Sequence, residues 1–129
     1  MRAQYYLGID VGSVTTDMVL LDEQQRIVYS DITATVADGR AAAQCLFEKM
    51  LAVQGLTSEA IAGSVACGYG RENVPFTHKT MTEITCHATA AHALFPNART
   101  VIDIGGEDTK VIALDESGKM RDFIMNNKC

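Results

Sequence analysis

The stretch GIDVGSVTTDMVLL, residues 8–21, decides the fold. Its two apolar halves are rich in strand-forming residues, and the Gly12-Ser13 pair between them is typical of a tight turn. Similar parts return at residues 103–114 as DIGGEDTKVIAL, where Gly105-Gly106 separates two further apolar runs. Strand, glycine turn and strand therefore occur twice, which predicts an internal duplication.

The pattern outward from the first hairpin predicts further strands. They are expected at about 26–35, 64–68, 100–106, 109–115 and 120–125. These runs favour β-structure because they are rich in β-branched and apolar residues and are bounded by turn-forming residues. Strands and helices then follow in the order β-β-β-α-β-α, with a second β-β-β series after them, as in an α/β protein.

Two helices are predicted between the strands. Apolar residues at helical spacing favour a helix over roughly 39–54, with Asp38 as its N-cap. Thr80 and Glu83 fit a capping box for the second helix, and Phe95-Pro96-Asn97 ends it. The second series of strands is expected to have no helix of its own.

Composition is typical of a globular protein with one core. The chain has 129 residues, of which 47% are hydrophobic, and domains of this size can bury a core. No run approaches the roughly 18 uncharged apolar residues of a membrane span, and the N-terminus lacks the apolar stretch of a signal peptide. We therefore expect a cytoplasmic protein with no membrane partner. Nucleic acid is not an expected partner either, because 11 basic residues stand against 16 acidic ones without a basic stripe.

Each glycine turn carries groups that can hold phosphate and magnesium. Asp10 and Asp103 each end a strand, while Gly12 and Gly105 let the backbone approach a ligand closely. The other candidate ligand-binding residues are Ser13, Thr15, Thr16, Gly106, Glu107, Asp108 and Lys110. Magnesium prefers one or two carboxylates with waters and phosphate oxygens, so Asp10 and Asp103 are the expected catalytic residues and hold a hydrated Mg²⁺. Two facing hairpins of this kind could clamp the phosphates of a nucleotide.

An ordinary hairpin is the alternative for either turn taken alone, since a tight turn often needs glycine for a positive φ. The presence of two copies favours phosphate binding. The chain has no GxxxxGK[ST] loop and no GxGxxG sequence that opens a helix. The grip on a nucleotide is therefore expected from hairpins and not from a helix N-terminus.

GIDVGSVTTD and DIGGEDTK resemble the phosphate 1 and phosphate 2 segments of the sugar kinase, heat-shock-protein 70 and actin superfamily. Three further segments sharpen the resemblance: ACGYGR at 66–71, TEITCHA at 82–88 and FIMNNKC at 123–129. Together they resemble the activator ATPases of 2-hydroxyacyl-CoA dehydratases and benzoyl-CoA reductases, the BadF/BadG/BcrA/BcrD family, across essentially the whole chain.

This resemblance implies a fold and an architecture. Residues 1–98 would form a ribonuclease H-like, actin-like ATPase domain with a mixed sheet and helices. Residues 99–129 would be the opening strands of a second, truncated domain of the same kind. The chain would then be the front part of a longer protein, and by itself it is expected to bind ATP weakly and to hydrolyse almost none.

The resemblance also implies a function. Members of the family are homodimers that hold one 4Fe–4S cluster, take an electron from a donor such as ferredoxin or flavodoxin, and use ATP to pass it to a dehydratase or reductase. ATP, Mg²⁺ and the cluster of the full-length dimer are the expected cofactors, and Cys129 corresponds to the first cluster cysteine. Glu107 and Asn127 replace a Gln and an Asp of the family pattern. The added charge of Glu107 is expected to weaken ATP binding or to alter hydrolysis.

Simpler interpretations stay open for several residues. Taken alone, Cys129 would be a solvated thiol, and the widely spaced Cys67 and Cys86 would be structural thiols on apolar faces. Glu83 and His87 are four residues apart on one helix, so we expect them to pair with each other. Two alternatives remain for the protein as a whole: a small-molecule kinase of the same superfamily, or a non-catalytic interaction domain that keeps the fold.

Overall fold

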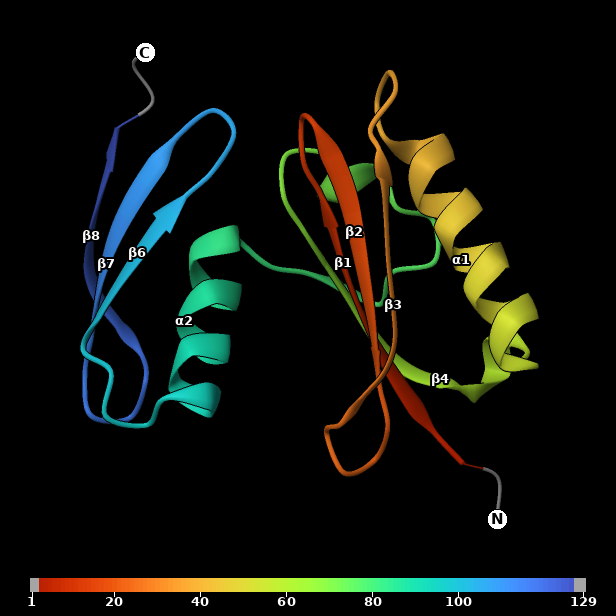
Figure 1. Cartoon of the computed structure of the whole chain (residues 1–129), viewed down its shortest axis with the longest axis horizontal. Helices are drawn as coiled ribbons and strands as arrows, with labels where there is room; N and C mark the ends of the chain where they lie inside the picture. Colours follow the sequence, from red (N-terminus) through yellow and green to blue (C-terminus); the bar gives the residue numbers. More distant parts are fainter. Residues whose placement is uncertain (1–2, 127–129) are drawn as a thin grey trace. The chain divides into compact units, whose positions relative to one another are not determined.

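The computed structural model describes residues 3–126. The chain divides into two compact units, one reaching to Met81 and the other starting at Thr82. Figure 1 follows the helices and strands along the chain. No helix among the described residues is long and apolar enough to cross a membrane.

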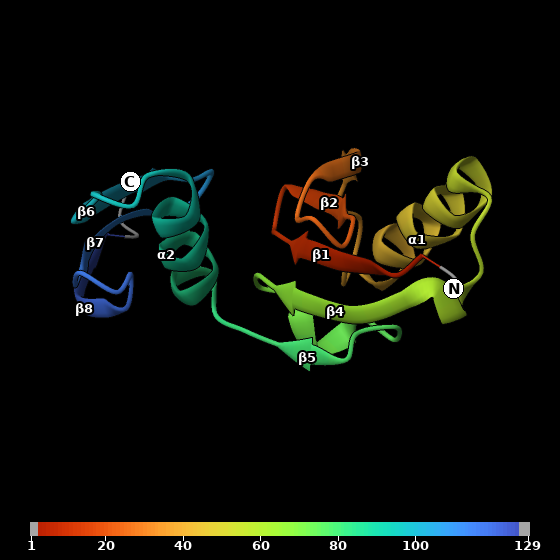
Figure 2. The same cartoon turned by 90° about the horizontal axis from the view of Figure 1, so that it is seen from below.

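The first unit is a mixed five-stranded sheet with a helix on one face (Figures 1 and 2). In the order β3-β2-β1-β4-β5, its strands are β1 (Tyr5–Val11), β2 (Thr15–Leu21), β3 (Ile27–Ala34), β4 (Ile61–Cys67) and β5 (Lys79–Thr80). The first three strands are antiparallel neighbours, whereas β4 runs parallel to β1 and β5 parallel to β4. Short turns suffice between antiparallel strands, while the parallel β4 is reached through helix α1 (Arg40–Gln54).

The core of the first unit lies between α1 and one face of the sheet. Successive side chains of a strand point to opposite faces, so alternate residues of β1 and β2 are buried. The buried apolar residues of these two strands are Leu7, Ile9, Val11, Met18 and Leu20. The buried residues of α1 recur at helical spacing and are Ala43, Leu46, Phe47 and Met50. Complete burial of Met50, at 0% exposure, contributes roughly 1.5–3 kcal/mol to stability.

The start of α1 differs from the expectation. Gly39 is the N-cap, with a φ of 78° and no side-chain cap hydrogen bond. Asp38, the expected N-cap, lies one residue earlier, and its Oδ1 accepts from the backbone N–H of Arg40 at 3.0 Å. The side chain therefore still satisfies a free N–H of the first turn, although a left-handed glycine begins the helix.

The start of the second helix also differs. Thr80, the expected cap, lies in β5. Helix α2 (Glu83–Leu94) is capped by Thr82, whose side chain accepts from the backbone N–H of Thr85 at 3.2 Å. Glu83 is thus the first residue of the helix and is not available for a capping box with Thr80.

The second unit is an antiparallel sheet of three strands, with α2 packed on one face (Figure 1). In spatial order the strands are β6 (Thr100–Ile104), β7 (Thr109–Leu114) and β8 (Met120–Asn126). Ala88 of α2 packs with Ile112 and Leu114 of β7, and each is at most 3% exposed. The expectation that this sheet has no helix is therefore wrong. The domain boundary after residue 98 stays a prediction about a complete two-domain fold.

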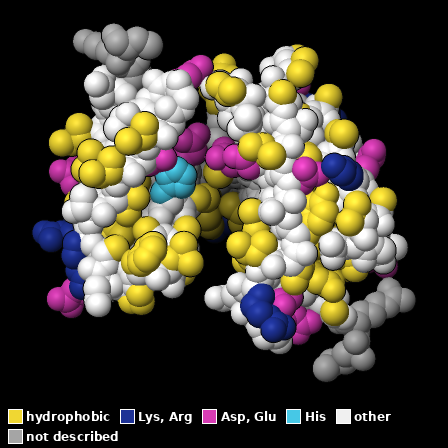
Figure 3. Space-filling view, viewed as in Figure 1, with side chains coloured by type: hydrophobic (Ala, Val, Ile, Leu, Met, Phe, Trp, Pro, Cys, Tyr) yellow, Lys and Arg dark blue, Asp and Glu magenta, His cyan; other side chains and the backbone are white. Residues whose placement is uncertain are grey.

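The other face of the second sheet carries exposed apolar side chains. Ile102 is 65% exposed, Ile104 78% and Ile124 71%. They alternate along β6 and β8 with residues that point toward α2, because the period of a strand is two. Figure 3 shows hydrophobic side chains at the surface of both units.

The predicted duplication of the glycine hairpin is present in the structure. In β1–β2, Asp10 lies opposite Asp17, and the N–H of Gly12 donates to the carbonyl of Thr15 at 2.9 Å. In β6–β7, Asp103 lies opposite Lys110, and the N–H of Gly105 donates to the carbonyl of Asp108 at 2.8 Å. Both hairpins therefore have the same register and the same hydrogen bond across the turn. The mixed α/β fold expected from the sequence is confirmed.

Candidate functional site

The first glycine turn lies between β1 and β2. Asp10 is half-buried near the end of β1, and Ser13 is exposed at the tip of the turn. A Cβ atom at Gly12 would lie only 2.9 Å from the carbonyl oxygen of Thr15. Glycine therefore fits this turn, because a side chain at residue 12 would crowd the Thr15 carbonyl.

Thr16 differs from the expectation of a hydroxyl group presented by the turn. Its side chain is at 0% exposure, and its Oγ1 lies 2.8 Å from the Oγ1 of Thr35. This hydrogen bond joins β2 to the residue that follows β3. Thr16 thus stabilises the turn from within, while Thr15 remains half-buried at the start of β2.

The loop after β4 packs on the same end of β1. Gly68 has a φ of 91°, and a Cβ atom there would collide with Oδ1 of Asp10 and lie 2.5 Å from the carbonyl oxygen of Val11. The N–H of Gly70 donates to that carbonyl at 2.9 Å. This contact was not predicted from the sequence, although the two glycines on either side of Tyr69 were a usable signal of close backbone approach.

Replacing Gly68 by alanine is expected to displace Asp10 and to destabilise the first unit by about 2–5 kcal/mol, because a positive φ and an overpacked contact add their costs. Urea unfolding of the chain, followed by circular dichroism, measures the change. Gly63→Ala in β4 is the matched control, since a Cβ atom there meets only the ring of Tyr6, at 3.5 Å. Equal midpoints for the two variants would contradict the close packing of Gly68 on Asp10.

The second glycine turn lies between β6 and β7. Gly105, Gly106 and Glu107 are exposed, while Asp103 and Asp108 are half-buried on either side of them. The expected ligand-binding residues of this turn are therefore brought together. The two turns belong to different units, and whether they face each other stays a prediction.

Lys110 is buried at the base of this turn. It is 4% exposed, and its Nζ lies 2.6 Å from Oδ1 of Asp108, 3.1 Å from Oε2 of Glu83 and 3.8 Å from Oδ2 of Asp103. Burial lowers the pKa of Lys110, but hydrogen bonds to Asp108 and Glu83 outweigh it, so the pKa lies above its ordinary value. Lys110 therefore stays charged, and its ammonium group contacts carboxylates of the protein. The sequence had instead suggested Lys110 as a residue that binds the ligand.

His87 makes a second contact from α2 to this hairpin. Its Nδ1 lies 3.1 Å from Oδ2 of Asp103. The expected pair of Glu83 with His87 is wrong, because each contacts a different residue of the β6–β7 hairpin: Glu83 binds Lys110 and His87 binds Asp103. Helical spacing identified two residues on one face but could not show that tertiary partners lie opposite them.

The described cysteines form no metal-binding group. Cys45 is exposed, Cys67 is buried and Cys86 is half-buried. Residues 3–126 contain no cluster of three or more His, Cys, Asp or Glu side chains arranged to hold a metal ion. Cys129, the expected cluster ligand, lies outside the described residues, so its role stays a prediction. On the face drawn in Figure 3, Lys and Arg side chains form no continuous stripe.

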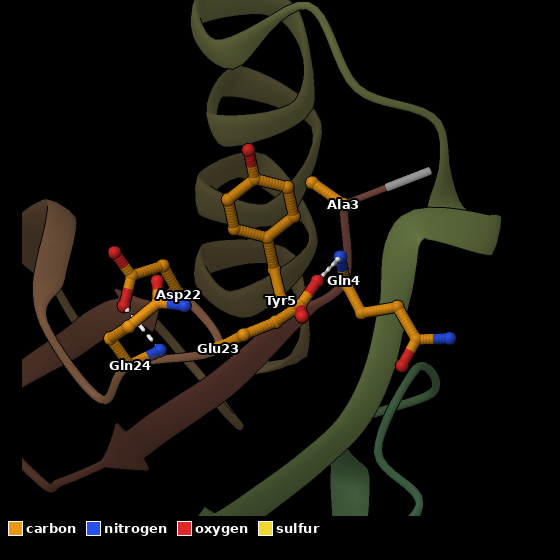
Figure 4. Close-up of a pocket in the computed structure, with 6 residues that line it drawn as sticks. All are labelled: Ala3, Gln4, Tyr5, Asp22, Glu23 and Gln24. Carbon is orange, nitrogen blue, oxygen red and sulfur yellow. Dashed lines mark hydrogen bonds between the residues drawn. The ribbon is translucent and has the colours of Figure 1, made fainter. Parts of the chain in front are cut away.

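A cavity of about 260 Å³ lies at the opposite end of β1 from Asp10. Figure 4 shows its lining, which comes from the start of β1 and the β2–β3 turn. Its carboxylates already hold the backbone: Glu23 accepts from the N–H of Gln4 at 2.8 Å, and Asp22 accepts from the N–H of Gln24 at 2.9 Å. The N–H of Arg26 also donates to Asp22 and holds its pKa below the ordinary value. We assign no chemistry to this cavity.

Comparison with known proteins gives close relatives. The chain is 44% identical over 125 residues to the activator of lactoyl-CoA dehydratase of Anaerotignum propionicum, covering 97% of this chain and 48% of that protein. It is 40% identical to the (R)-2-hydroxyglutaryl-CoA dehydratase activating ATPase of Acidaminococcus fermentans, again covering 97% of this chain and 48% of that protein. The chain thus spans about half the length of the curated relatives it matches.

A solved structure agrees with these relatives. The activator of 2-hydroxyisocaproyl-CoA dehydratase from Clostridium difficile with bound ADPNP superposes with a TM-score of 0.86 at 38% identity, covering 98% of this chain and 47% of that one. The family model of the BadF/BadG/BcrA/BcrD ATPases matches residues 7–129. With nearly all of its length matched, the chain belongs to the BadF/BadG/BcrA/BcrD ATPase family.

Proposed function

We propose that the protein carrying this chain binds and hydrolyses ATP and activates a 2-hydroxyacyl-CoA dehydratase or a benzoyl-CoA reductase-type enzyme. One observation carries the proposal: two glycine hairpins of identical register, each with an Asp at the strand end, occur in a chain of this ATPase family. Repeated turns with exposed tips suit the phosphates of a nucleotide. The relatives named as dehydratase activators support the kind of partner.

Magnesium would be held through Asp10 and Asp103. Both are half-buried carboxylates next to a turn whose tip is exposed. Magnesium keeps several waters and uses one or two carboxylates, so neither residue needs a cage of protein ligands. One oxygen of Asp103 already contacts His87 at 3.1 Å, which suits a contact to the metal through water. When bound, the ion would neutralise charge on the phosphates.

ATP hydrolysis would be coupled to transfer of a low-potential electron. The electron would come from a donor such as ferredoxin or flavodoxin and pass through a 4Fe–4S cluster shared by a homodimer. A 4Fe–4S cluster takes four thiolates, so Cys129 from each subunit would supply two of them, and a further cysteine of each subunit the other two. This part of the proposal rests on the family to which the chain belongs.

The test uses the intact protein that carries this chain, purified without oxygen. We expect magnesium-dependent release of phosphate from ATP and the electron paramagnetic resonance signal of a reduced 4Fe–4S cluster. A phosphorylated small-molecule product in place of free phosphate would favour the kinase alternative. The absence of both ATP hydrolysis and a cluster signal would favour an interaction domain.

The 129-residue chain alone is expected to show weak Mg-ATP binding in calorimetry. Tight binding and turnover by the chain alone would contradict that part of the proposal.

A further inference from the structure

Helix α2 contacts the second glycine hairpin through two side chains one helical turn apart. Glu83 contacts Lys110 and His87 contacts Asp103, and these two hairpin residues lie directly opposite each other on β7 and β6. Neighbours at i and i+4 on a helix therefore meet neighbours across a strand pair. We call these four residues the α2 clamp.

Within the α2 clamp, Lys110 acts indirectly. Its side chain is only 6% exposed, and three carboxylates surround its ammonium group. A buried ammonium that already donates hydrogen bonds to two carboxylates is a poor ligand for an incoming phosphate. Its position instead controls the charge on its neighbours, since Nζ lies 3.1 Å from Glu83 but 3.8 Å from Asp103. Two hydrogen bonds, to Asp108 at 2.6 Å and to Glu83 at 3.1 Å, thus hold the ammonium beyond hydrogen-bond distance of Asp103.

The contact with His87 orients Asp103. Both contacts of this carboxylate use Oδ2: one comes from Nδ1 of His87 at 3.1 Å and the other from Lys110 at 3.8 Å. Oδ1 takes part in neither. A carboxylate fixed through one oxygen would keep the other oxygen for a metal-bound water. Hydrogen-bonding partners commonly orient metal ligands in this way.

We propose that Glu83 and His87 are positioning residues for the second phosphate-binding turn. Glu83 acts together with Asp108 by holding Lys110 away from Asp103, and His87 acts by orienting the Asp103 carboxylate. The inference rests on the proposed function, because it assigns these residues to the same Mg-nucleotide site. Without Glu83, Lys110 would keep its hydrogen bond to Asp108 but lose the second one, and it would move closer to Asp103 and neutralise part of the charge that attracts the metal. Without His87, Asp103 would lose its fixed orientation.

The test measures magnesium-dependent binding of the non-hydrolysable analogue ADPNP to the intact protein by calorimetry, together with kcat and KM for Mg-ATP. Glu83→Gln and His87→Phe are each expected to raise the half-saturating Mg²⁺ concentration about 10-fold, the lower end of the effect of losing a partner of a metal ligand. His87→Asn, which keeps a donor in a similar place, is expected to recover most of the affinity. Glu116→Gln, a charge-matched change at an exposed carboxylate of the same unit, is expected to leave binding unchanged.

A double-variant comparison separates positioning from folding. In a Lys110→Met background, Glu83→Gln is expected to cause no further loss of magnesium affinity, because Glu83 acts through Lys110. If Glu83→Gln unfolds the protein, the pair His87→Phe and His87→Asn still decides the outcome at a half-exposed position. Wild-type magnesium dependence in folded Glu83→Gln and His87→Phe, with Asp10→Asn inactive, would overturn the positioning roles alone. Full binding and turnover by Asp10→Asn would instead overturn the proposed function.

Discussion

Asp10→Asn is expected to abolish Mg-ATP hydrolysis by the intact protein while leaving its fold unchanged. Asparagine keeps the shape of the side chain and removes the charge that would order water on the metal. Charge stabilisation by a metal is worth several kcal/mol in a transition state, so we expect kcat to fall by about 100-fold or more. Phosphate release at saturating Mg-ATP measures the effect, and circular dichroism checks the fold.

Asp17→Asn is the matched control for this substitution. Asp17 lies directly opposite Asp10 in the β1–β2 hairpin, on the same face of the sheet. Among the described residues, its Oδ1 is buried without a hydrogen-bond partner, so removing its charge should not harm the fold. We expect Asp17→Asn to keep most of the turnover. An equal fall in both variants would indicate a general charge effect, and unchanged turnover in Asp10→Asn would refute its assigned role.

Much of the fold could be predicted because its local signals agree. Two apolar runs rich in strand-forming residues, with a glycine turn between them, indicate the β1–β2 hairpin before any tertiary contact is known. The repeat of that hairpin in β6 and β7 is readable for the same reason. The helix starts were less certain, because Asp38 and Gly39 both suit an N-cap and backbone geometry decides between them.

The packing of α2 could not be predicted from its own residues. Many of them are small or polar, and within the helix only Ala88 is fully buried. Such a helix does not show which sheet it covers. Its assignment to the second unit depends on Ile112 and Leu114 of β7, which are distant in sequence.

The candidate site likewise has residues that local sequence signals identify and contacts that only the tertiary structure reveals. The turn residues Asp10, Gly12, Asp103 and Gly105 were identified because glycine and a strand-ending carboxylate are local signals. The contact of Lys110 with Glu83 was missed because Glu83 lies 27 residues away in sequence. A spacing of four residues on a helix favours pairing between Glu83 and His87, but the buried ammonium of Lys110 offers Glu83 a stronger partner than a histidine does.

Lys110→Met is expected to destabilise the second unit by about 3–5 kcal/mol, the usual cost of removing one partner from a buried ion pair. Methionine fills the volume of the side chain but leaves Glu83, Asp103 and Asp108 without their shared cation. The three carboxylates are 22–31% exposed, so water relieves part of the repulsion and the lower end of this range is the better expectation. Hydrogen exchange of the Ile112 and Leu114 amides, both in β7, reports on this unit separately.

The dependence of this loss on pH distinguishes charge from packing. Hydrogen bonds to Asp108 and Glu83 raise the pKa of Lys110 above its ordinary value of 10.5 despite the opposing effect of burial. The stability that Lys110 contributes is therefore fully present below pH 10.5 and is lost as the pH rises through the higher pKa of the folded state. Protection of the β7 amides should fall in the wild-type chain over that range, and Lys110→Met should lack the fall. Lys119→Met, at an exposed lysine of the same unit, should behave like the wild type. An equal loss of protection in Lys110→Met at every pH would show that packing, and not the ammonium charge, stabilises this turn.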